Sequence, residues 1–129
     1  MLIFKNKSFA RFARKAGLTD ANLRKAISDA ERGLIDADLG GGVIKQRIAR
    51  PGEGKSGGFR TVILFRIGAR AFFVHGFAKN DLDNISDYEL AAFKMLAAEM
   101  LNYNDVAIAK AVVDGVLMGV LEDEKAIPQ

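Results

Sequence analysis

Three segments with strand character follow one another in the middle of the chain, and their spacing constrains the fold more than any other feature. They are residues 43–49 ("VIKQRIA"), 59–67 ("FRTVILFRI") and 70–79 ("RAFFVHGFAK"), which are rich in β-branched and aromatic residues. The connections between them are short, as antiparallel pairing allows. We therefore predict a three-stranded antiparallel meander over residues 43 to 79.

Helical patterns precede this meander. In two segments near the N-terminus, apolar residues recur at spacings of three and four. Ser8 can cap the first helix and Gly17 can end it. Thr19 can cap the second helix, which runs to about Gly33. The sequence thus predicts two short helices before the sheet.

A further helical pattern follows the meander. Ser86 and Glu89 have the spacing of a capping box, in which each side chain bonds to the other residue's backbone N–H. They predict the start of a long helix that runs to about residue 103. A last short helix is expected after Asn104, and residues 116–121 ("VLMGVL") can form a closing strand.

Together these elements predict an α+β fold: two N-terminal helices, an antiparallel sheet of three to four strands, and C-terminal helices. We expect the helices to cover one face of the sheet. The 129 residues have the size of one domain, and no internal repeat or linker divides them. Residues 1–129 are therefore interpreted as a single domain.

Charge is strongly segregated along the chain. Residues 1–18 contain five basic residues and no acidic one, and residues 39–80 contain eight basic residues against Glu53 alone. Residues 81–129 reverse the balance, with ten acidic residues against three lysines. A basic working surface favours a polyanion, above all a nucleic acid, as the partner. The alternative is an ordinary set of solvated lysines and arginines on strand faces.

The composition narrows the chemistry. The chain has no cysteine, which excludes disulfides, a thiolate metal site and a thiol nucleophile. We expect neither a metal nor a cofactor. The apolar run at the N-terminus is too short for a signal peptide, and the run "VLMGVL" is too short to span a bilayer. A cytoplasmic protein that does not bind a membrane is therefore expected.

The glycine-rich loop "GEGKSGGFR" (residues 52–60) invites comparison with the phosphate loop of nucleotide-binding proteins. Gly54, Lys55 and Ser56 fit the end of that motif, but Ala49 stands where its first glycine should be. The loop also leads into a strand, whereas a phosphate loop leads into a helix whose amide groups meet the phosphate. Two interpretations remain: a hairpin connection with one solvated lysine, or a loop that presents Lys55 to another kind of phosphate.

Three segments around the meander carry a family resemblance: "GKSGGFRTVILFR", "RAFFVHGFAKN" and "NISDYEL". They resemble the RelE/HigB group of bacterial type II toxin–antitoxin toxins, in the RelE/ParE superfamily, best over residues 40 to 100. The resemblance implies a RelE-like fold and an mRNA interferase, an endoribonuclease that cuts messenger RNA on the translating ribosome and inhibits translation. It also implies a cognate antitoxin, often with a helix-turn-helix, so that DNA is bound only through the antitoxin complex.

The resemblance also points to catalytic residues. Lys55 matches the loop lysine of the group, Arg60 its strand arginine and Lys79 the lysine of "FAKN". RNA can be cut without a metal when its own 2′-hydroxyl attacks the next phosphate. Side chains must then remove that proton, stabilise the charge on phosphorus and protonate the leaving 5′-oxygen. Arginine binds phosphate oxygens and stays charged, and a lysine among cations can become a base.

His75, the one histidine of the chain, can fill the role of the acid. Strand alternation places it on one face with Phe73, Phe77 and Lys79. The alternatives are that His75 is a packing residue and that the phenylalanines belong to the core before they serve as surfaces for stacked bases. RNA binding is expected from the neighbouring strand cations Lys45, Arg47 and Arg66.

One departure from the group concerns the C-terminus. Several ribonuclease members have a tyrosine or histidine there, whereas this chain ends "EDEKAIPQ". Tyr103 lies on the expected long helix and is either a core residue or a catalytic one. Two other functions therefore stay open beside RNA cleavage: a ParE-like gyrase poison with the same fold, and a non-catalytic nucleic-acid-binding module.

Overall fold

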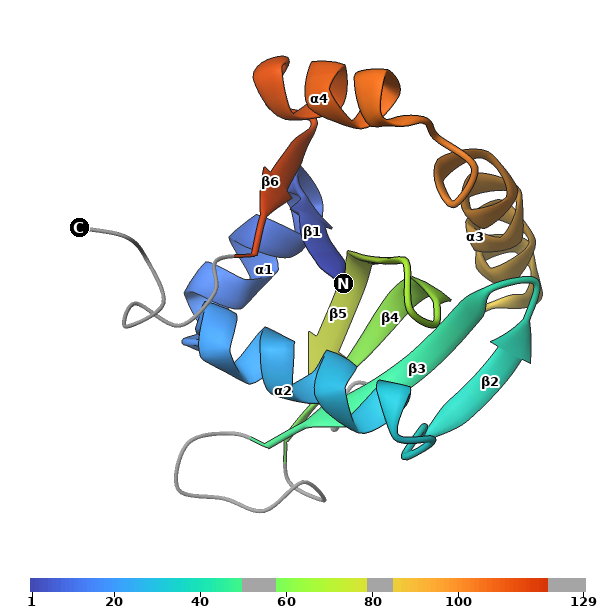
Figure 1. Ribbon diagram of the computed structural model, residues 1–129. Helices are drawn as coiled ribbons and strands as arrows, with labels where there is room; N and C mark the ends of the chain where they lie inside the picture. Colours follow the sequence, from blue (N-terminus) through green and yellow to red (C-terminus); the bar gives the residue numbers. More distant parts are fainter. Residues whose placement is uncertain (50–57, 79–84, 121–129) are drawn as a thin grey trace.

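The computed structural model describes residues 1–49, 58–78 and 85–120 (Figure 1). Within these ranges the chain forms one six-stranded sheet, with strand order β2-β3-β4-β5-β1-β6, and four helices. The strands are β1 (Leu2–Asn6), β2 (Ala37–Gly40), β3 (Val43–Ile48), β4 (Phe59–Arg66), β5 (Arg70–Ala78) and β6 (Leu117–Gly119). The helices are α1 (Lys7–Ala16), α2 (Asp20–Glu31), α3 (Asp87–Met100) and α4 (Asp105–Val113).

The predicted meander forms the centre of the sheet. β3 pairs antiparallel with β4, and β4 pairs antiparallel with β5. The α+β class and the antiparallel arrangement of residues 43–78 are therefore confirmed. The closing strand is also confirmed, since β6 pairs antiparallel with β1.

Two strands extend the sheet beyond the prediction. β1 lies parallel to β5, so the N-terminal residues before the first helix are part of the sheet. β2 pairs antiparallel with β3. The turn between them uses Gly40, Gly41 and Gly42, with φ values of 84°, 62° and 83°. These left-handed conformations suit glycine, which has no Cβ to clash with the backbone.

Most of the predicted helix caps are present. Thr19 and Ser86 each form a capping box, with Asn22 and Glu89 as their partners, and Asn104 caps α4. The prediction for α1 was wrong by two residues. The side chain of Asn6, at the end of β1, accepts a hydrogen bond from the backbone N–H of Phe9 at 2.8 Å, so α1 follows the strand directly.

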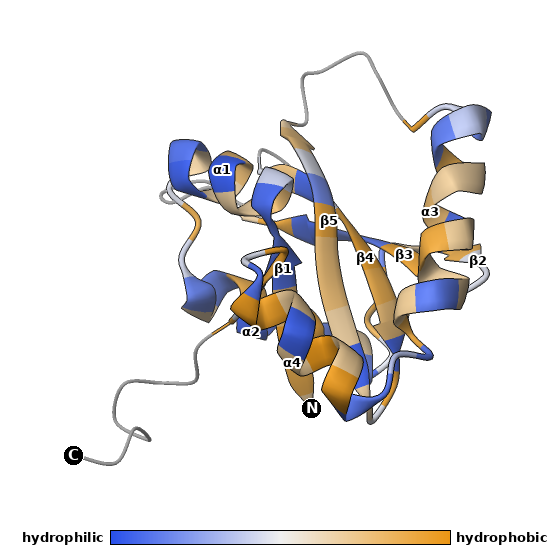
Figure 2. Cartoon of the chain, turned by 90° about the horizontal axis from the view of Figure 1, so that it is seen from above, coloured by the Kyte–Doolittle hydropathy of each residue, from blue (hydrophilic) through white to orange (hydrophobic). Residues whose placement is uncertain are grey.

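The helices cover both faces of the sheet. On one face Phe9 of α1 and Leu23 of α2 pack into a core with Phe73. On the other face Ala97 of α3 packs into a second core with Val62. Figure 2 shows α1 on one side of β4 and β5 and α3 on the other. The expectation of one covered face was wrong because β4 and β5 carry apolar side chains on both faces, and each face needs a cover.

An irregularity in β5 determines which residues reach each face. Opposite the consecutive residues Val62 and Ile63 of β4, the partners on β5 jump from His75 to Phe73. This bulge adds one residue to β5 and reverses the alternation beyond it. Phe73 therefore points into the α1–α2 core, while the ring of His75 contacts Phe93 of α3. The expectation that these two side chains share a face was wrong for this reason.

No helix in the described ranges has the length and apolar character needed to cross a membrane.

Candidate nucleic-acid interface

Two transverse rows of residues cross β3, β4 and β5 on the face covered by α3. Residues that pair directly across antiparallel strands share a face, and so do residues two apart on one strand. Val62 belongs to the core beneath α3 and fixes the face for both rows. The first row is Lys45, Val62 and His75, and the second row is Arg47, Arg60 and Phe77.

These rows bring together four of the seven side chains that the sequence predicted for the site. Lys45, Arg47, Arg60 and His75 lie within two neighbouring rows, as the sequence predicted for a phosphate-binding surface. Lys55 and Lys79, the other two candidates for catalysis, lie outside the described residues. Arg66 is described, and it lies at the opposite end of β4 from Arg60.

Arg66 contacts the end of α3 instead of the two rows. Its Nη1 donates a hydrogen bond to the backbone oxygen of Leu101 at 2.7 Å, and its Nη2 donates to Oδ1 of Asn102 at 3.2 Å. Both acceptors lie at the C-terminal end of α3, where backbone carbonyls need donors. Arg66 thus connects the sheet to α3 and is not brought together with the two rows.

Asp36 joins the two arginines of the second row. Its Oδ1 lies 2.9 Å from Nε of Arg47, and its Oδ2 lies 3.5 Å from Nη1 of Arg60. The side chains of Asp36 and Arg60 are 22% and 23% exposed, and that of Arg47 is 43% exposed. Arg47 and Arg60 are direct partners across the strands. One carboxylate therefore sits against two adjacent guanidinium groups.

Gln46 holds the segment that carries Asp36. This buried amide points to the α2 side of the sheet, where its Nε2 donates to the backbone oxygens of Ala26 and Leu34, each at 3.0 Å. Its Oε1 accepts a hydrogen bond from the backbone N–H of Asp36 at 2.8 Å. Gln46 therefore ties the end of α2, the segment after it and β3 together.

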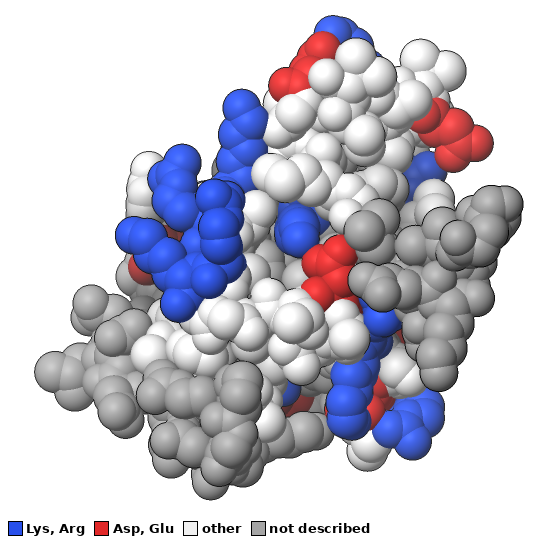
Figure 3. Space-filling model, turned by 90° about the vertical axis from the view of Figure 1, so that its left-hand side faces the viewer, with Lys and Arg blue, Asp and Glu red and all other residues white. Residues whose placement is uncertain are grey.

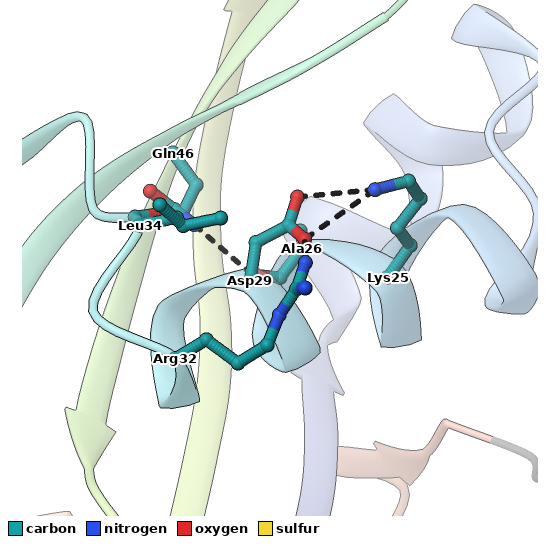
Figure 4. A network of polar contacts seen from close by, with 6 residues as sticks. All are labelled: Lys25, Ala26, Asp29, Arg32, Leu34 and Gln46. Carbon is teal, nitrogen blue, oxygen red and sulfur yellow. Dashed lines mark hydrogen bonds and ion pairs between the residues drawn. The ribbon is translucent and has the colours of Figure 1, made fainter.

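The end of α2 is fixed by a second polar contact, shown beside Gln46 in Figure 4. The side chain of Asp29 is buried and contacts Lys25 at 3.2 Å and Arg32 at 2.7 Å. These cations compensate the cost of a carboxylate in the core. With Gln46, they set the path of the chain from α2 to β2, and so the place of Asp36.

His75 lies in an aromatic environment. Its ring centroid is 5.8 Å from that of Phe77 and 5.8 Å from that of Phe93. Glu89 of α3 is close enough to be affected by it. The pKa of Glu89 is lowered, mainly because its carboxylate accepts hydrogen bonds from Ser86, and to a smaller degree by the charge of His75. His75 therefore packs against α3 while it remains in the same row as Lys45.

Tyr103 lies away from the rows. Its ring packs against the core beneath α3 and α4, and its hydroxyl donates a hydrogen bond to Glu99 at 3.2 Å. Burial, followed by the contact with Glu99, raises the pKa of Tyr103. Of the two interpretations left open by the sequence, the structure favours the packing role.

Sequence reasoning missed Asp36 and Gln46. A polar residue between Ile44 and Ile48 on an otherwise apolar strand face was a signal for Gln46, because a buried amide needs partners. No local pattern marks Asp36, whose contacts with β3 and β4 arise only in the folded chain.

A family model described as RelE toxin of RelE / RelB toxin-antitoxin system matches residues 1–120. No curated protein matches the sequence. The match covers most of the chain and agrees with the fold. The chain belongs to the RelE toxin family. It is a toxin of a toxin–antitoxin system, and its family implies a cognate antitoxin as partner.

Proposed function

We propose that this toxin is a metal-independent endoribonuclease that cuts messenger RNA on the ribosome and so inhibits translation. The observation that carries the proposal is the pair Arg47 and Arg60, side by side in the second row and joined to one carboxylate. Two adjacent guanidinium groups offer several N–H donors to the oxygens of a phosphodiester. The family supports the toxin role, and its members are generally endoribonucleases.

The proposed reaction needs only the RNA and side chains of this chain. The 2′-oxygen attacks the adjacent phosphorus, and the bond from phosphorus to the 5′-oxygen breaks. The products are a 2′,3′-cyclic phosphate and a free 5′-hydroxyl. Lys55 or Lys79 removes the proton of the 2′-hydroxyl, and Arg60 stabilises the charge that develops on the phosphate oxygens. His75 is the candidate donor of a proton to the leaving oxygen.

Phe77 gives the second row an apolar element. It pairs with Arg60 across the strands and is partly exposed. A base next to the bound phosphate can stack on an exposed aromatic ring, which contributes about 1–3 kcal/mol per base in single-strand recognition. The arrangement suits an unpaired RNA strand, whose bases are free to stack.

A second basic surface supports dependence on the ribosome. Helix α1 carries no acidic residue, and its cations lie on one exposed stripe opposite the buried Phe9. Figure 3 shows basic side chains gathered on the face of the molecule that carries this helix. Such a stripe suits the phosphates of structured RNA, which the ribosome presents next to the message. Its members are Lys7, Arg11, Arg14 and Lys15.

The remaining features of the proposal concern the partner and the compartment. We infer that the antitoxin is of the helix-turn-helix type and that the toxin meets DNA only through the antitoxin complex. The site of action is the cytoplasm, where translating ribosomes are found.

The test is induction of the toxin in growing bacteria, with and without its antitoxin. We expect growth to stop, protein synthesis to fall and cut messages with 5′-hydroxyl ends to appear within minutes. Arrest of replication with intact messages would instead identify a gyrase poison. Binding to RNA without cleavage or growth arrest would identify a non-catalytic module.

A further inference from the structure

We propose that Asp36 is a positioning residue, which holds Arg47 and Arg60 together so that both guanidinium groups bind one phosphate. This inference rests on the proposed RNA-directed function and names a residue that the sequence pattern did not mark. Three observations carry it: the double contact of Asp36, the rigid support of its backbone, and the space beside it.

The double contact of Asp36 involves one nitrogen of each guanidinium group. Asp36 contacts Nε of Arg47 and Nη1 of Arg60. A guanidinium group has five N–H donors in a planar fork, so one contact fixes its orientation and leaves further donors for an anion. Without the carboxylate, two like charges opposite each other on neighbouring strands repel and separate. Asp36 therefore keeps the donors of both arginines close to one another.

The backbone of Asp36 is itself fixed. Its N–H donates to the buried Gln46, whose own amide group is bound to Ala26 and Leu34. These hydrogen bonds attach the backbone of Asp36 to α2 and β3, and so fix the position of its carboxylate. A support of this kind is what a positioned group requires, because small displacements of a binding group reduce catalysis strongly.

There is space for an anion beside Asp36 and Arg47. A depression of about 300 Å³ is lined by Leu34, Ile35, Asp36, Gln46 and Arg47. The side chain of Arg47, which contributes to this lining, is 43% exposed. A phosphate can therefore approach Arg47 and Asp36 without displacing the core, and Arg60 is the partner of Arg47 across the strands.

The first test follows the arginine side chains directly by NMR. The ¹H–¹⁵N signals of the Nε–H groups are assigned with Arg47→Lys and Arg60→Lys. In the wild type, the Nε–H of Arg47 should give a sharp signal shifted by the carboxylate of Asp36, which lies 2.9 Å from Nε. In Asp36→Asn, it should broaden and move towards the position of free arginine. If the signals of both arginines are unchanged in this variant, the positioning role is refuted.

A matched control is available on the same segment. Asp38 is exposed, and its carboxylate accepts a hydrogen bond from the N–H of Gly40 at 2.9 Å, which an asparagine can also accept. Asp38→Asn removes the same charge without touching the arginines. It should leave both arginine signals and the melting temperature as in the wild type.

The second test measures cleavage on programmed ribosomes. Asp36→Asn should lower kcat by about ten- to a hundredfold, since the arginines lose their common orientation. KM should stay the same or fall, because the site loses a negative charge. If Asp36→Asn raises kcat/KM without loss of kcat, Asp36 only competes with RNA for the two arginines. An unchanged kcat with a lower melting temperature would show a purely structural role. Either result overturns the proposal.

A third measurement separates this inference from the proposed function. A short single-stranded RNA with 2′-O-methyl groups cannot be cut, and it is titrated into labelled protein. The Arg47 and Arg60 signals should shift together with one Kd in the wild type and with separate values in Asp36→Asn. If wild-type toxin fails to cut RNA, the proposed function fails, while this titration still decides the role of Asp36. Absence of a shared response in the wild type refutes that role.

Discussion

Arg47 and Arg60 lie directly opposite each other on β3 and β4, and one carboxylate, that of Asp36, contacts both. Like charges in opposed positions destabilise a sheet by about 0.2–1 kcal/mol. Partly exposed ion pairs stabilise a protein by about 0–1 kcal/mol each. The two effects are of similar size, so the cluster contributes little to folding. The binding of an anion proposed above gives this arrangement a role.

We first predict the behaviour of Arg60→Ala. Toxicity should be lost, and mRNA cleavage should fall by about 10²- to 10³-fold, by analogy with the loss of one transition-state donor. The melting temperature should change little, because the contact of Arg60 with Asp36 is long, at 3.5 Å. Growth arrest, cleavage of a reporter message and thermal unfolding are measured on the same variant.

The control for this experiment is Lys110→Gln. Lys110 is an exposed cation on α4 that pairs with Asp114, away from the second row. Loss of its charge should leave cleavage intact, which tests whether any reduction of net charge suffices. Full toxicity of Arg60→Ala would remove the second row from consideration as the catalytic surface.

A second prediction concerns Lys55, which lies outside the described residues. Lys55→Ala should abolish toxicity. Lys55→Arg distinguishes two roles, because arginine binds phosphate but does not release its proton. No rescue by arginine is expected if Lys55 transfers a proton, and partial rescue is expected if it only holds phosphate. Single-turnover cleavage is then measured across a range of pH values. If Lys55 transfers a proton, the pH profile of Lys55→Arg should lack one ionisation that the wild type shows. If Lys55 only holds phosphate, the two profiles should have the same shape.

The third prediction is that Gln46→Leu destabilises the fold. Leucine fills a similar volume, but it leaves the Asp36 N–H and the oxygens of Ala26 and Leu34 without their amide partner. The contact with Ala26 is buried, whereas those with Asp36 and Leu34 are part-buried. A buried polar group that loses its partner costs about 1–3 kcal/mol, so unfolding should need less urea. Unchanged stability would mean that water replaces the amide, and that the support assigned to Gln46 is not needed.

Local signals in the sequence predicted much of the fold. The capping partners Ser86 and Glu89 lie three residues apart and mark a helix start without any help from the rest of the chain. The meander could also be predicted from the sequence, because each of its strands pairs with the next strand along the chain. β1 was missed because its partner is β5, about seventy positions away, where Phe4 pairs with Phe72. No short-range pattern encodes that pairing.

The sequence also predicted part of the site, because strand alternation is local whereas the other contacts of the site form only in the folded chain. The sequence predicted Lys45, Arg47 and Arg60 as neighbouring strand cations, and the pairing of β3 with β4 places them on one face. Alternation failed on β5, where the bulge next to Val74 moves His75 to the face opposite Phe73. The role of Asp36 could not be predicted, since its contacts join three segments that meet only when α2 is docked.

The last prediction concerns Gly76, which lies just beyond that bulge and packs against α1. A Cβ at this position would lie 2.3 Å from Cε2 of Phe12. The ring of Phe12 cannot move freely, because it contacts Phe9 and Phe59 at centroid distances of 5.7 and 5.6 Å. Gly76→Ala should therefore destabilise the fold by about 1–3 kcal/mol, as expected for an overpacked core. Gly119→Ala is the matched control, with no atom within 4 Å of its added Cβ. Urea unfolding of the two variants should differ by that amount, and equal stabilities would show that α1 can shift away from β5.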